Sequence, residues 1–549
     1  MEGTFWSLVP PLLTIILAVW TKEVILSLFI GVYLGCLMVT GWNPLMALLK
    51  LFHYVCDPYG DDHDLVDPDD IYSGNAYESG AFCNPENMQV LILVTLLGGL
   101  IGLFIKTGGS KAFGDMLQRK VKTKTGAQLI TWGIGLLIFF DDYFNAMTNG
   151  NVMRPVTDRY GISREKLSYI VDSTSVGICL ISPISSWVAF LAGLIATEFA
   201  KNPEYADENS FISFMKTVPY NYYAILSIIM VLIVILLKLD YGPMAKAERR
   251  TAETGKVCDA VFGAAGDDDD EDEEGDYDSI KPANGGVAIF LIPIICLIAL
   301  AFILILWTGG FFDPEWNQGN LIGAVNDMDG MKALITAVTI VTILLIIWAA
   351  LARLVNPIAA VSAWVTGCKS MMYVILLLAL AWSLGDICAD MDTAGFLTQS
   401  LGVLPNAVLV LLIFAIACVL TFTTGAAWAT YPIMIPIAVP LAFATGITPY
   451  AMIAAVIGGG GYGNHTSPLA DTCILSSSSS NIRHTDHVKT QVPYSTLCAV
   501  AAGVGYIFSG IMDTFVIPMI VAFAVFFVGV FILAKLFGGG KASAAKIEE

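Results

Sequence analysis

Residues 169–187 read YIVDSTSVGICLISPISSW, and residues 458–480 read GGGGYGNHTSPLADTCILSSSSS. Both stretches are largely apolar, and each is interrupted by a Ser-Pro pair, at Pro183 and at Pro468. Proline inside a helix removes a backbone hydrogen bond and kinks or breaks the helix. Irregular backbone at membrane depth is tolerated only where it is buried in protein or lines a cavity. We therefore expect two broken membrane segments at corresponding places in the chain.

The composition around these segments is that of an all-α polytopic membrane protein. Of 549 residues, 56% are hydrophobic and 14% are charged, whereas a soluble domain carries about 25% charged residues. A membrane-spanning helix needs about 20 apolar residues. The candidate spans are a short one at 10–20 and full-length ones at 24–41, 88–105, 222–239, 288–307, 333–354, 371–388, 493–511 and 515–536.

Two acidic runs account for much of the net charge of −19. One lies between Asp57 and Asp70 and the other between Asp267 and Asp278, and both are typical of solvated loops. A calcium site in the first run is the alternative, but the run lacks EF-hand spacing. The cysteines form no CxxC pair, so we expect neither a zinc site nor any other cofactor. A disulfide between Cys56 and Cys83 is left open.

The Lys and Arg bias of the loops predicts the orientation. Basic residues follow the span 88–105 and also lie in 240–284, so both loops should be cytoplasmic. The N-terminus is then external and the C-terminus cytoplasmic, in a multi-pass protein of the cell (inner) membrane. This orientation requires residues 127–150 and 405–440 to enter and leave on the same side. We therefore predict two re-entrant hairpins.

One constant shift along the sequence brings the two halves into register. It places Pro155 on Pro440 and Ser182-Pro183 on Ser467-Pro468. Each half would hold five spans and one hairpin, and an odd number of spans inverts the second half. In transporters, interrupted segments at matching places of inverted repeats mark the binding site. The predicted organisation is a first repeat (1–240), an acidic cytoplasmic linker (241–284), a second repeat (285–540) and a cytoplasmic tail (541–549).

Ionisable groups inside a membrane are expensive and mark functional sites. Asp141 and Asp142 end the apolar run 133–140, near the tip of the first hairpin, with Asn145 one turn later. Two adjacent carboxylates repel each other, so one of them can hold a proton near neutral pH. The pair suits exchange of a proton for a hard cation. The alternative is that the aspartates cap a helix or pair with Arg154.

Asp172 lies in the first broken segment among hydroxyl groups that could bind sodium. The alternative is hydrogen bonding between helices. The second broken segment has glycines that allow close backbone approach, and Asp471 is its one carboxylate. His465 could titrate near physiological pH or serve as a structural hydrogen-bonding group. The candidate ion or substrate ligands are Asp141, Asp142, Asn145, Asp172, Ser173, Thr174, Ser182, Ser185, Thr424, Trp428, Asn464, His465, Ser467, Asp471 and Thr472, with sodium at Asp142, Asp172 and Asp471.

At these residues the chain resembles the NhaC-type sodium/proton antiporter family of the ion-transporter superfamily. The resembling segments are DDYFNAMTNGNVMRPVTDRYGISREKLSYIVDSTS (141–175), SPISSW (182–187), TGAAWATYPIMIPI (424–437) and GNHTSPLADTCILSS (463–477). The resemblance implies sodium as coupling ion, a scaffold and a transport domain, a homodimer and an elevator-like step. This chain has Asn464 where relatives usually carry an acidic residue, and Ala-Trp-Ala at 427–429 where Thr/Ser-Trp-Gly is common.

Four functions remain to be separated. Sodium/proton exchange by alternating access is the leading one, and sodium-coupled transport of an amino acid or small organic acid is the second. A channel is disfavoured because carboxylates at hairpin tips suit tight, alternating binding better than fast permeation. An intramembrane hydrolase lacks a nucleophile elbow or metal motif, so we expect no enzyme. The expected partners are membrane lipid, sodium and a proton or small solute, with no nucleic acid.

Overall fold

The computed structural model describes residues 3–56, 80–259 and 286–537, apart from short gaps at 22–23, 207, within 110–120, within 315–327 and within 394–403. Both acidic runs, residues 260–284 of the linker and the C-terminal tail lie outside the described residues. Within the described ranges all regular structure is helical. Nine helices there are long and apolar enough to cross a membrane, and a tenth candidate is the bent pair α2 and α3. The protein is therefore a multi-pass membrane protein.

The helices of the N-terminal half follow one another closely. They are α1 (Val9–Thr21), α2 (Val24–Val39), α3 (Pro44–Cys56), α5 (Pro85–Thr107), α7 (Lys124–Leu137), α8 (Asp142–Arg159), α9 (Arg164–Cys179), α10 (Ser186–Ala200), α11 (Ser210–Thr217), α12 (Tyr222–Leu237) and α13 (Gly242–Thr254).

The helices after the linker make up the C-terminal half. They are α14 (Ala288–Thr308), α16 (Gly330–Leu351), α17 (Pro357–Ser370), α18 (Met372–Asp390), α20 (Asn406–Thr424), α21 (Ala427–Thr445), α22 (Pro449–Thr466), α23 (Asp471–Ser480), α24 (His484–Ser509) and α25 (Val516–Phe537).

The expected breaks fall between helices. The chain leaves α9 after Cys179 and re-enters a helix at Ser186, on either side of Pro183, and Pro468 separates α22 from α23 in the same way. Both expected hairpins are helical pairs, α7 with α8 and α20 with α21. Helices α20 and α21 are each long enough to cross a membrane. The starts of α21, α22 and α23 follow those of α8, α9 and α10 by one common offset, the same shift that places Pro155 on Pro440.

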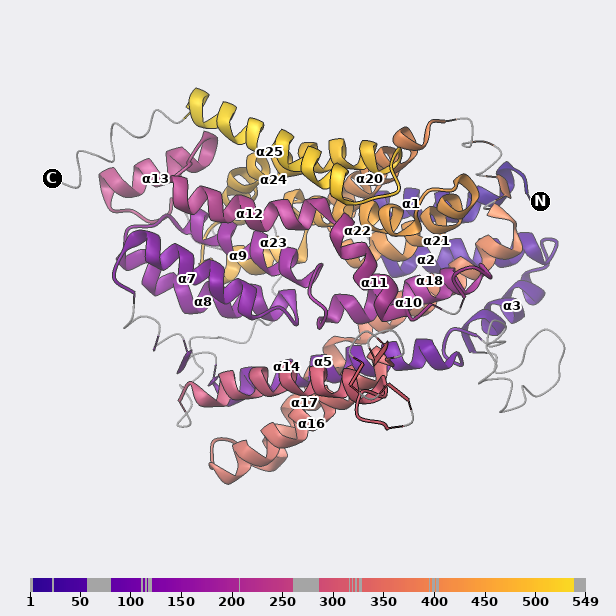
Figure 1. Ribbon diagram of the computed structural model, residues 1–549, viewed down its shortest axis with the longest axis horizontal. Helices are drawn as coiled ribbons and strands as arrows, with labels where there is room; N and C mark the ends of the chain where they lie inside the picture. Colours follow the sequence, from indigo (N-terminus) through magenta and orange to yellow (C-terminus); the bar gives the residue numbers. More distant parts are fainter. Residues whose placement is uncertain are drawn as a thin grey trace.

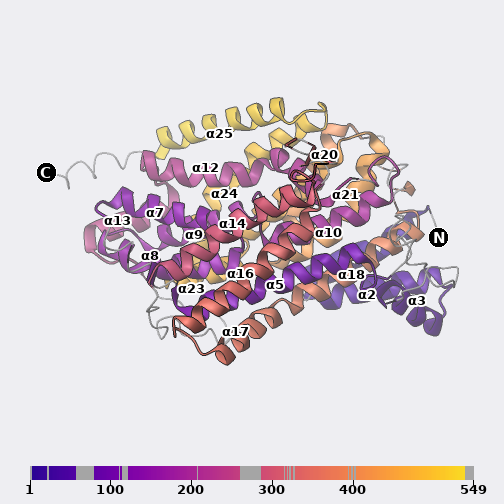
Figure 2. The ribbon, with the colours of Figure 1, turned by 60° about the horizontal axis from the view of Figure 1, so that its bottom comes forward.

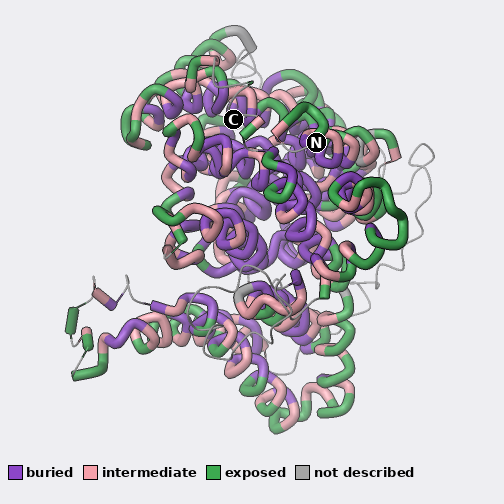
Figure 3. Tube along the Cα trace, turned by 90° about the vertical axis from the view of Figure 1, so that its right-hand side faces the viewer, coloured by how far each residue is buried: buried purple, intermediate pink, exposed green. Residues whose placement is uncertain are grey.

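The helices form two bodies (Figures 1 and 2). Helices α5, α14, α16 and α17 make a separate layer, and the others form the larger body. In the layer, α5 and α17 approach closely through glycines, because a Cβ on Gly367 would overlap the Gly98 carbonyl oxygen. Gly98 and Gly102 are spaced as in the small-residue motif that lets membrane helices meet. Figure 3 shows exposed residues along the outer side of this layer.

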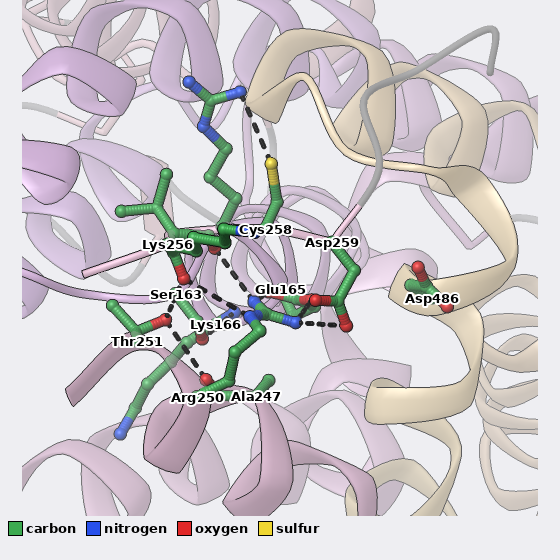
Figure 4. Close-up of polar contacts among 12 residues, drawn as sticks. Ser163, Glu165, Lys166, Ala247, Arg250, Thr251, Lys256, Cys258, Asp259 and Asp486 are labelled. Atoms are coloured by element: carbon green, nitrogen blue, oxygen red, sulfur yellow. Dashed lines mark hydrogen bonds and ion pairs between the residues drawn. The ribbon is translucent and has the colours of Figure 1, made fainter. Parts of the chain in front are cut away.

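The described part of the linker is bound to the larger body (Figure 4). The Arg250 guanidinium on α13 donates two 2.9 Å hydrogen bonds to the carboxylate of Glu165, in the first turn of α9. It also donates to Asp259, at 2.8 Å, and to the Val257 carbonyl, at 3.1 Å. The described linker residues therefore belong to the folded body. Cys56 and Cys83, for which a disulfide was left open, are not joined by one, and Cys83 Sγ donates to the Cys56 carbonyl.

Candidate functional site

Four helices of the larger body meet at their N-terminal ends, two from each half of the chain. Asp141 caps α8 by accepting a 2.8 Å hydrogen bond from the Phe144 amide, and the Ser186 hydroxyl at the start of α10 donates to its other oxygen at 3.1 Å. The Tyr143 hydroxyl donates at 2.8 Å to Asp471, the first residue of α23. Helix N-termini carry partial positive charge, so this meeting point favours negatively charged groups.

Two stacked tryptophans, one from each half of the chain, lie at the same meeting point. The rings of Trp187 on α10 and Trp428 on α21 stack with centroids 3.8 Å apart and planes 20° from parallel. Both side chains are buried, and neither indole nitrogen has a hydrogen-bond partner among the described residues. Stacking brings the expected Trp428 into the site and adds Trp187, which was not among the predicted ligands.

Asp142 is buried beside this pair, and its carboxylate is unlike the others in the site. Neither of its oxygens accepts a hydrogen bond from any described residue. The indole nitrogen of Trp187 lies near enough to affect it electrostatically, but not in ordinary hydrogen-bond geometry. A buried charge without partners is costly, so such a group holds a proton or a cation.

Two amide oxygens continue a row from Asp142 along α8. Asn145 and Asn149 are three and seven residues further on, so they lie on the same face of the helix. The Asn145 amide nitrogen donates to the carbonyls of Gly135 and Ile138, at the C-terminal end of α7, and that of Asn149 donates to Thr131. Both side-chain oxygens are buried and have no partner among the described residues. Carboxylate and amide oxygens are ligands for hard cations.

Asp172, in contrast, is surrounded by donors from the second half. Ser476 donates to one carboxylate oxygen at 3.1 Å, and Gln491 and Cys473 donate to the other. The ring nitrogen Nε2 of His487 lies 3.7 Å from that second oxygen. The three aspartates expected to share sodium therefore have different surroundings. Asp142 has no partner among the described residues, Asp172 is held by buried donors, and Asp471 is an exposed residue that accepts from Tyr143.

Four of the other expected ligands hold the backbone at the two breaks. The Ser185 hydroxyl accepts from the Val188 amide as the cap of α10, and that of Ser467 accepts from the Leu469 amide. The Thr472 hydroxyl donates to Asn464 Oδ1 at 3.2 Å, which joins the two sides of the second break. Three other hydroxyls donate to backbone carbonyls nearby in the chain: Thr174 to Ile170, Ser182 to Ile184 and Thr424 to Leu420. His465 is hydrogen-bonded to the Tyr223 hydroxyl, and Ser173 is buried.

The ligands predicted from the sequence did not include Asn149, Ser476, His487 and Gln491. The spacing of Asn149 from Asp142 and Asn145 could have revealed it, because polar residues three to four apart inside an apolar segment share a helix face. Gln491 and His487 were hidden because α24 carries many polar residues at its N-terminal end. Their roles depend on Asp172, which is distant in sequence and separated from Gln491 by 319 residues.

The chain is similar to known proteins along most of its length. A model of the "Na+/H+ antiporter family" matches residues 177–511. An uncharacterized protein of Haemophilus influenzae is 32% identical over 518 residues, which cover 93% of this chain and 91% of that protein. The crystal structure of the Alcanivorax borkumensis YdaH transporter, described as having an unusual topology, matches with a TM-score of 0.56 at 16% identity. That match covers 89% of this chain and 98% of YdaH and shows a shared fold. The chain belongs to the Na+/H+ antiporter family, and the protein is a secondary transporter.

Proposed function

We propose that the protein exchanges sodium for protons and that the two ions compete for Asp142. The observation that carries this proposal is the buried carboxylate of Asp142, with no partner among the described residues, in line with the free amide oxygens of Asn145 and Asn149. Sodium takes oxygen ligands and needs a negative charge when buried. A proton on the same carboxylate removes that charge, so the two ions exclude each other.

The exchange is tested in liposomes that contain a pH-sensitive dye. Asp142→Asn keeps the size of the side chain and removes its charge, so sodium-driven proton movement should fall at least about tenfold. Because the native carboxylate has no described partner, the variant should keep its thermal stability. Asp313→Asn, the same change at an exposed residue, should retain wild-type exchange. Wild-type exchange in Asp142→Asn would overturn the proposal.

We further propose that the larger body moves past the layer of α5, α14, α16 and α17 in an elevator-like step. The common offset between the starts of α8 and α21, α9 and α22, and α10 and α23 supports two inverted repeats in the moving body. Val90 on α5 touches α10 at Gly193. A disulfide between Val90→Cys and Gly193→Cys should stop transport, and reduction should restore it. Unimpaired transport with the disulfide formed would contradict this step.

The layer would act as the scaffold of a homodimer in the cell membrane, with the N-terminus outside and the C-terminus in the cytoplasm. Lys and Arg in the loops after α5 and α12 support this orientation. Labelling of single cysteines from each side of intact cells checks it. Labelling of Lys246→Cys from outside would contradict this orientation.

Sodium-coupled exchange of a small organic anion is the second candidate. The meeting of four helix N-termini and the two buried indole nitrogens without described partners favour it, since both attract carboxylates. Sodium uptake would then increase on addition of an amino acid or organic acid, without a pH signal. Trp428→Phe, which keeps a ring for stacking but removes the N–H, would lower the affinity for the anion and leave sodium uptake in the absence of the anion unchanged.

A further inference from the structure

Three buried side chains from both halves of the chain meet around one carboxylate oxygen. They are Asp172 on α9, Cys473 on α23 and His487 on α24, and their ligand atoms all lie within 4.8 Å of one another. Each of the three is 0% exposed. Carboxylate, thiolate and imidazole together are the ligands of borderline-soft divalent metals. We propose that this cluster binds such an ion, with Zn²⁺ as the best match, at a site separate from the oxygen row of Asp142.

The distances suit a tetrahedral centre. Cys473 Sγ lies 3.5 Å from Asp172 Oδ2, and His487 Nε2 lies 3.7 Å from the same oxygen. Ordinary zinc bond lengths place sulfur and oxygen about 3.6 Å apart in a tetrahedron, and nitrogen and oxygen about 3.4 Å apart. The two contacts of Asp172 Oδ2 therefore match a tetrahedral metal centre to within a few tenths of an ångström, and the third pair of ligand atoms, Cys473 Sγ and His487 Nε2, lies within 4.8 Å. The fourth position can be taken by water.

The surrounding side chains orient each ligand. His487 Nδ1 is hydrogen-bonded to the Ser168 hydroxyl at 2.8 Å, while its Nε2 has no hydrogen-bond partner among the described residues. A proton on Nδ1, donated to Ser168, leaves the lone pair of Nε2 facing the cluster. Ser476 and Gln491 hold the Asp172 carboxylate. Outer hydrogen bonds of this kind fix the tautomer and direction of metal ligands.

The ligand set excludes sodium as the ion bound here, since sodium prefers oxygen ligands to sulfur and nitrogen. Binding of Zn²⁺ releases the Cys473 thiol proton, and the double charge of the metal balances the thiolate and the Asp172 carboxylate. The bound ion would join α9 of the first half to α23 and α24 of the second. It would thereby stabilise the larger body.

The test uses Co²⁺ added to the purified full-length protein, in which Cys56 and Cys83 are changed to serine to remove two accessible thiols. We expect one equivalent to bind with a thiolate-to-cobalt charge-transfer band. Cys473→Ser should abolish the band, His487→Gln should weaken binding at least tenfold, and Cys498→Ser, a buried cysteine elsewhere on α24, should change neither. No band in the parent protein, or an unchanged band in Cys473→Ser, overturns the proposal.

Thermal unfolding in Zn²⁺ gives a second measurement that does not depend on transport. A ligand that binds the folded state raises the unfolding temperature. The temperature should rise with Zn²⁺ in the Cys56→Ser, Cys83→Ser parent and in Cys498→Ser, but not in Cys473→Ser. An equal rise in all three proteins would show binding elsewhere and would contradict the site. Neither measurement depends on transport, so the result of the Asp142→Asn exchange assay does not affect the test of the metal site.

Discussion

The hydroxyl of Tyr143, on the residue after Asp142, donates a 2.8 Å hydrogen bond to the carboxylate of Asp471 at the start of α23. This contact joins the tip of the first hairpin to the second broken segment, across 328 residues of sequence. The contact therefore holds the two elements together beside the candidate ion site.

Tyr143→Phe removes only this hydrogen bond. Because Asp471 is exposed, the net contribution of the bond is about 0.5–1.5 kcal/mol, and loosening α23 beside the ion site should raise the half-saturating sodium concentration about two- to tenfold. Sodium titration of exchange in liposomes measures the change. Tyr160→Phe, which removes a hydroxyl that donates to the Val121 carbonyl, is the matched control and should leave sodium affinity unchanged. Equal affinities in the two variants would separate Tyr143 from ion binding.

Asn149→Ala removes one oxygen of the row on α8. Loss of a ligand should lower sodium affinity at least about tenfold, because the amide oxygen is replaced by no other polar group. Asn151→Ala is the control on the same helix, since Asn151 is only partly buried and donates to the Met147 carbonyl. Sodium-dependent exchange of both variants is compared with wild type. A similar loss of sodium affinity in both variants would mean that α8 as a whole is disturbed and that the Asn149 oxygen is not a sodium ligand.

Arg250→Lys keeps the charge that faces Glu165 but loses the two-pronged contact. One hydrogen bond to a charged group contributes about 1.5–3 kcal/mol, and lysine cannot replace the fork of arginine. Residues 255–259 should therefore exchange backbone hydrogens faster, as measured by mass spectrometry. Arg249→Lys, at a neighbouring residue of α13, should leave the exchange unchanged. Unchanged protection in Arg250→Lys would mean that other contacts hold the segment.

Gly367→Ala tests the contact of α5 with α17. The added Cβ would overlap the Gly98 carbonyl oxygen, so the helices must separate at a cost of about 1–3 kcal/mol. Gly133→Ala adds the same group to α7 where nothing lies within 4 Å. It should be neutral or stabilising, because alanine favours helix more than glycine by about 1 kcal/mol. Unfolding temperatures in detergent that move in the same direction for both variants would contradict this view.

Glu208, in the loop between α10 and α11, should make stability depend on pH. Burial opposes ionisation, but hydrogen bonds from Lys216, Tyr450 and Ser213 lower the pKa of Glu208 below its usual 4.5. A lowered pKa in the folded state stabilises the protein above pH 4.5, and this contribution is lost as pH falls through the folded value. The unfolding temperature should therefore drop below pH 4.5, less steeply in Glu208→Gln than in wild type. Glu204→Gln, at an exposed residue of the same loop, should follow wild type.

The amino-acid pattern alone predicted the membrane class, most of the spans and the two proline breaks. Helical pairs stand where hairpins were predicted at 127–150 and 405–440, and the re-entrant course of these pairs stays a prediction. These features follow from runs of apolar residues and from proline, which act through neighbouring positions along the chain. Capping of a helix by the aspartate pair was the alternative left open by the sequence, and it is confirmed for Asp141, which accepts from the Phe144 amide.

The difference between the three aspartates arises from tertiary packing. Asp172 accepts from Ser476 and Gln491, Asp471 accepts from Tyr143, and Asp142 accepts no hydrogen bond in ordinary geometry from any described residue. These contacts join residues from opposite halves of the chain, and no local pattern specifies which helices pack together. A carboxylate in an apolar segment looks the same in sequence whether its charge is satisfied or free. Packing of the two halves creates that difference, because it brings donors to one carboxylate and withholds them from another.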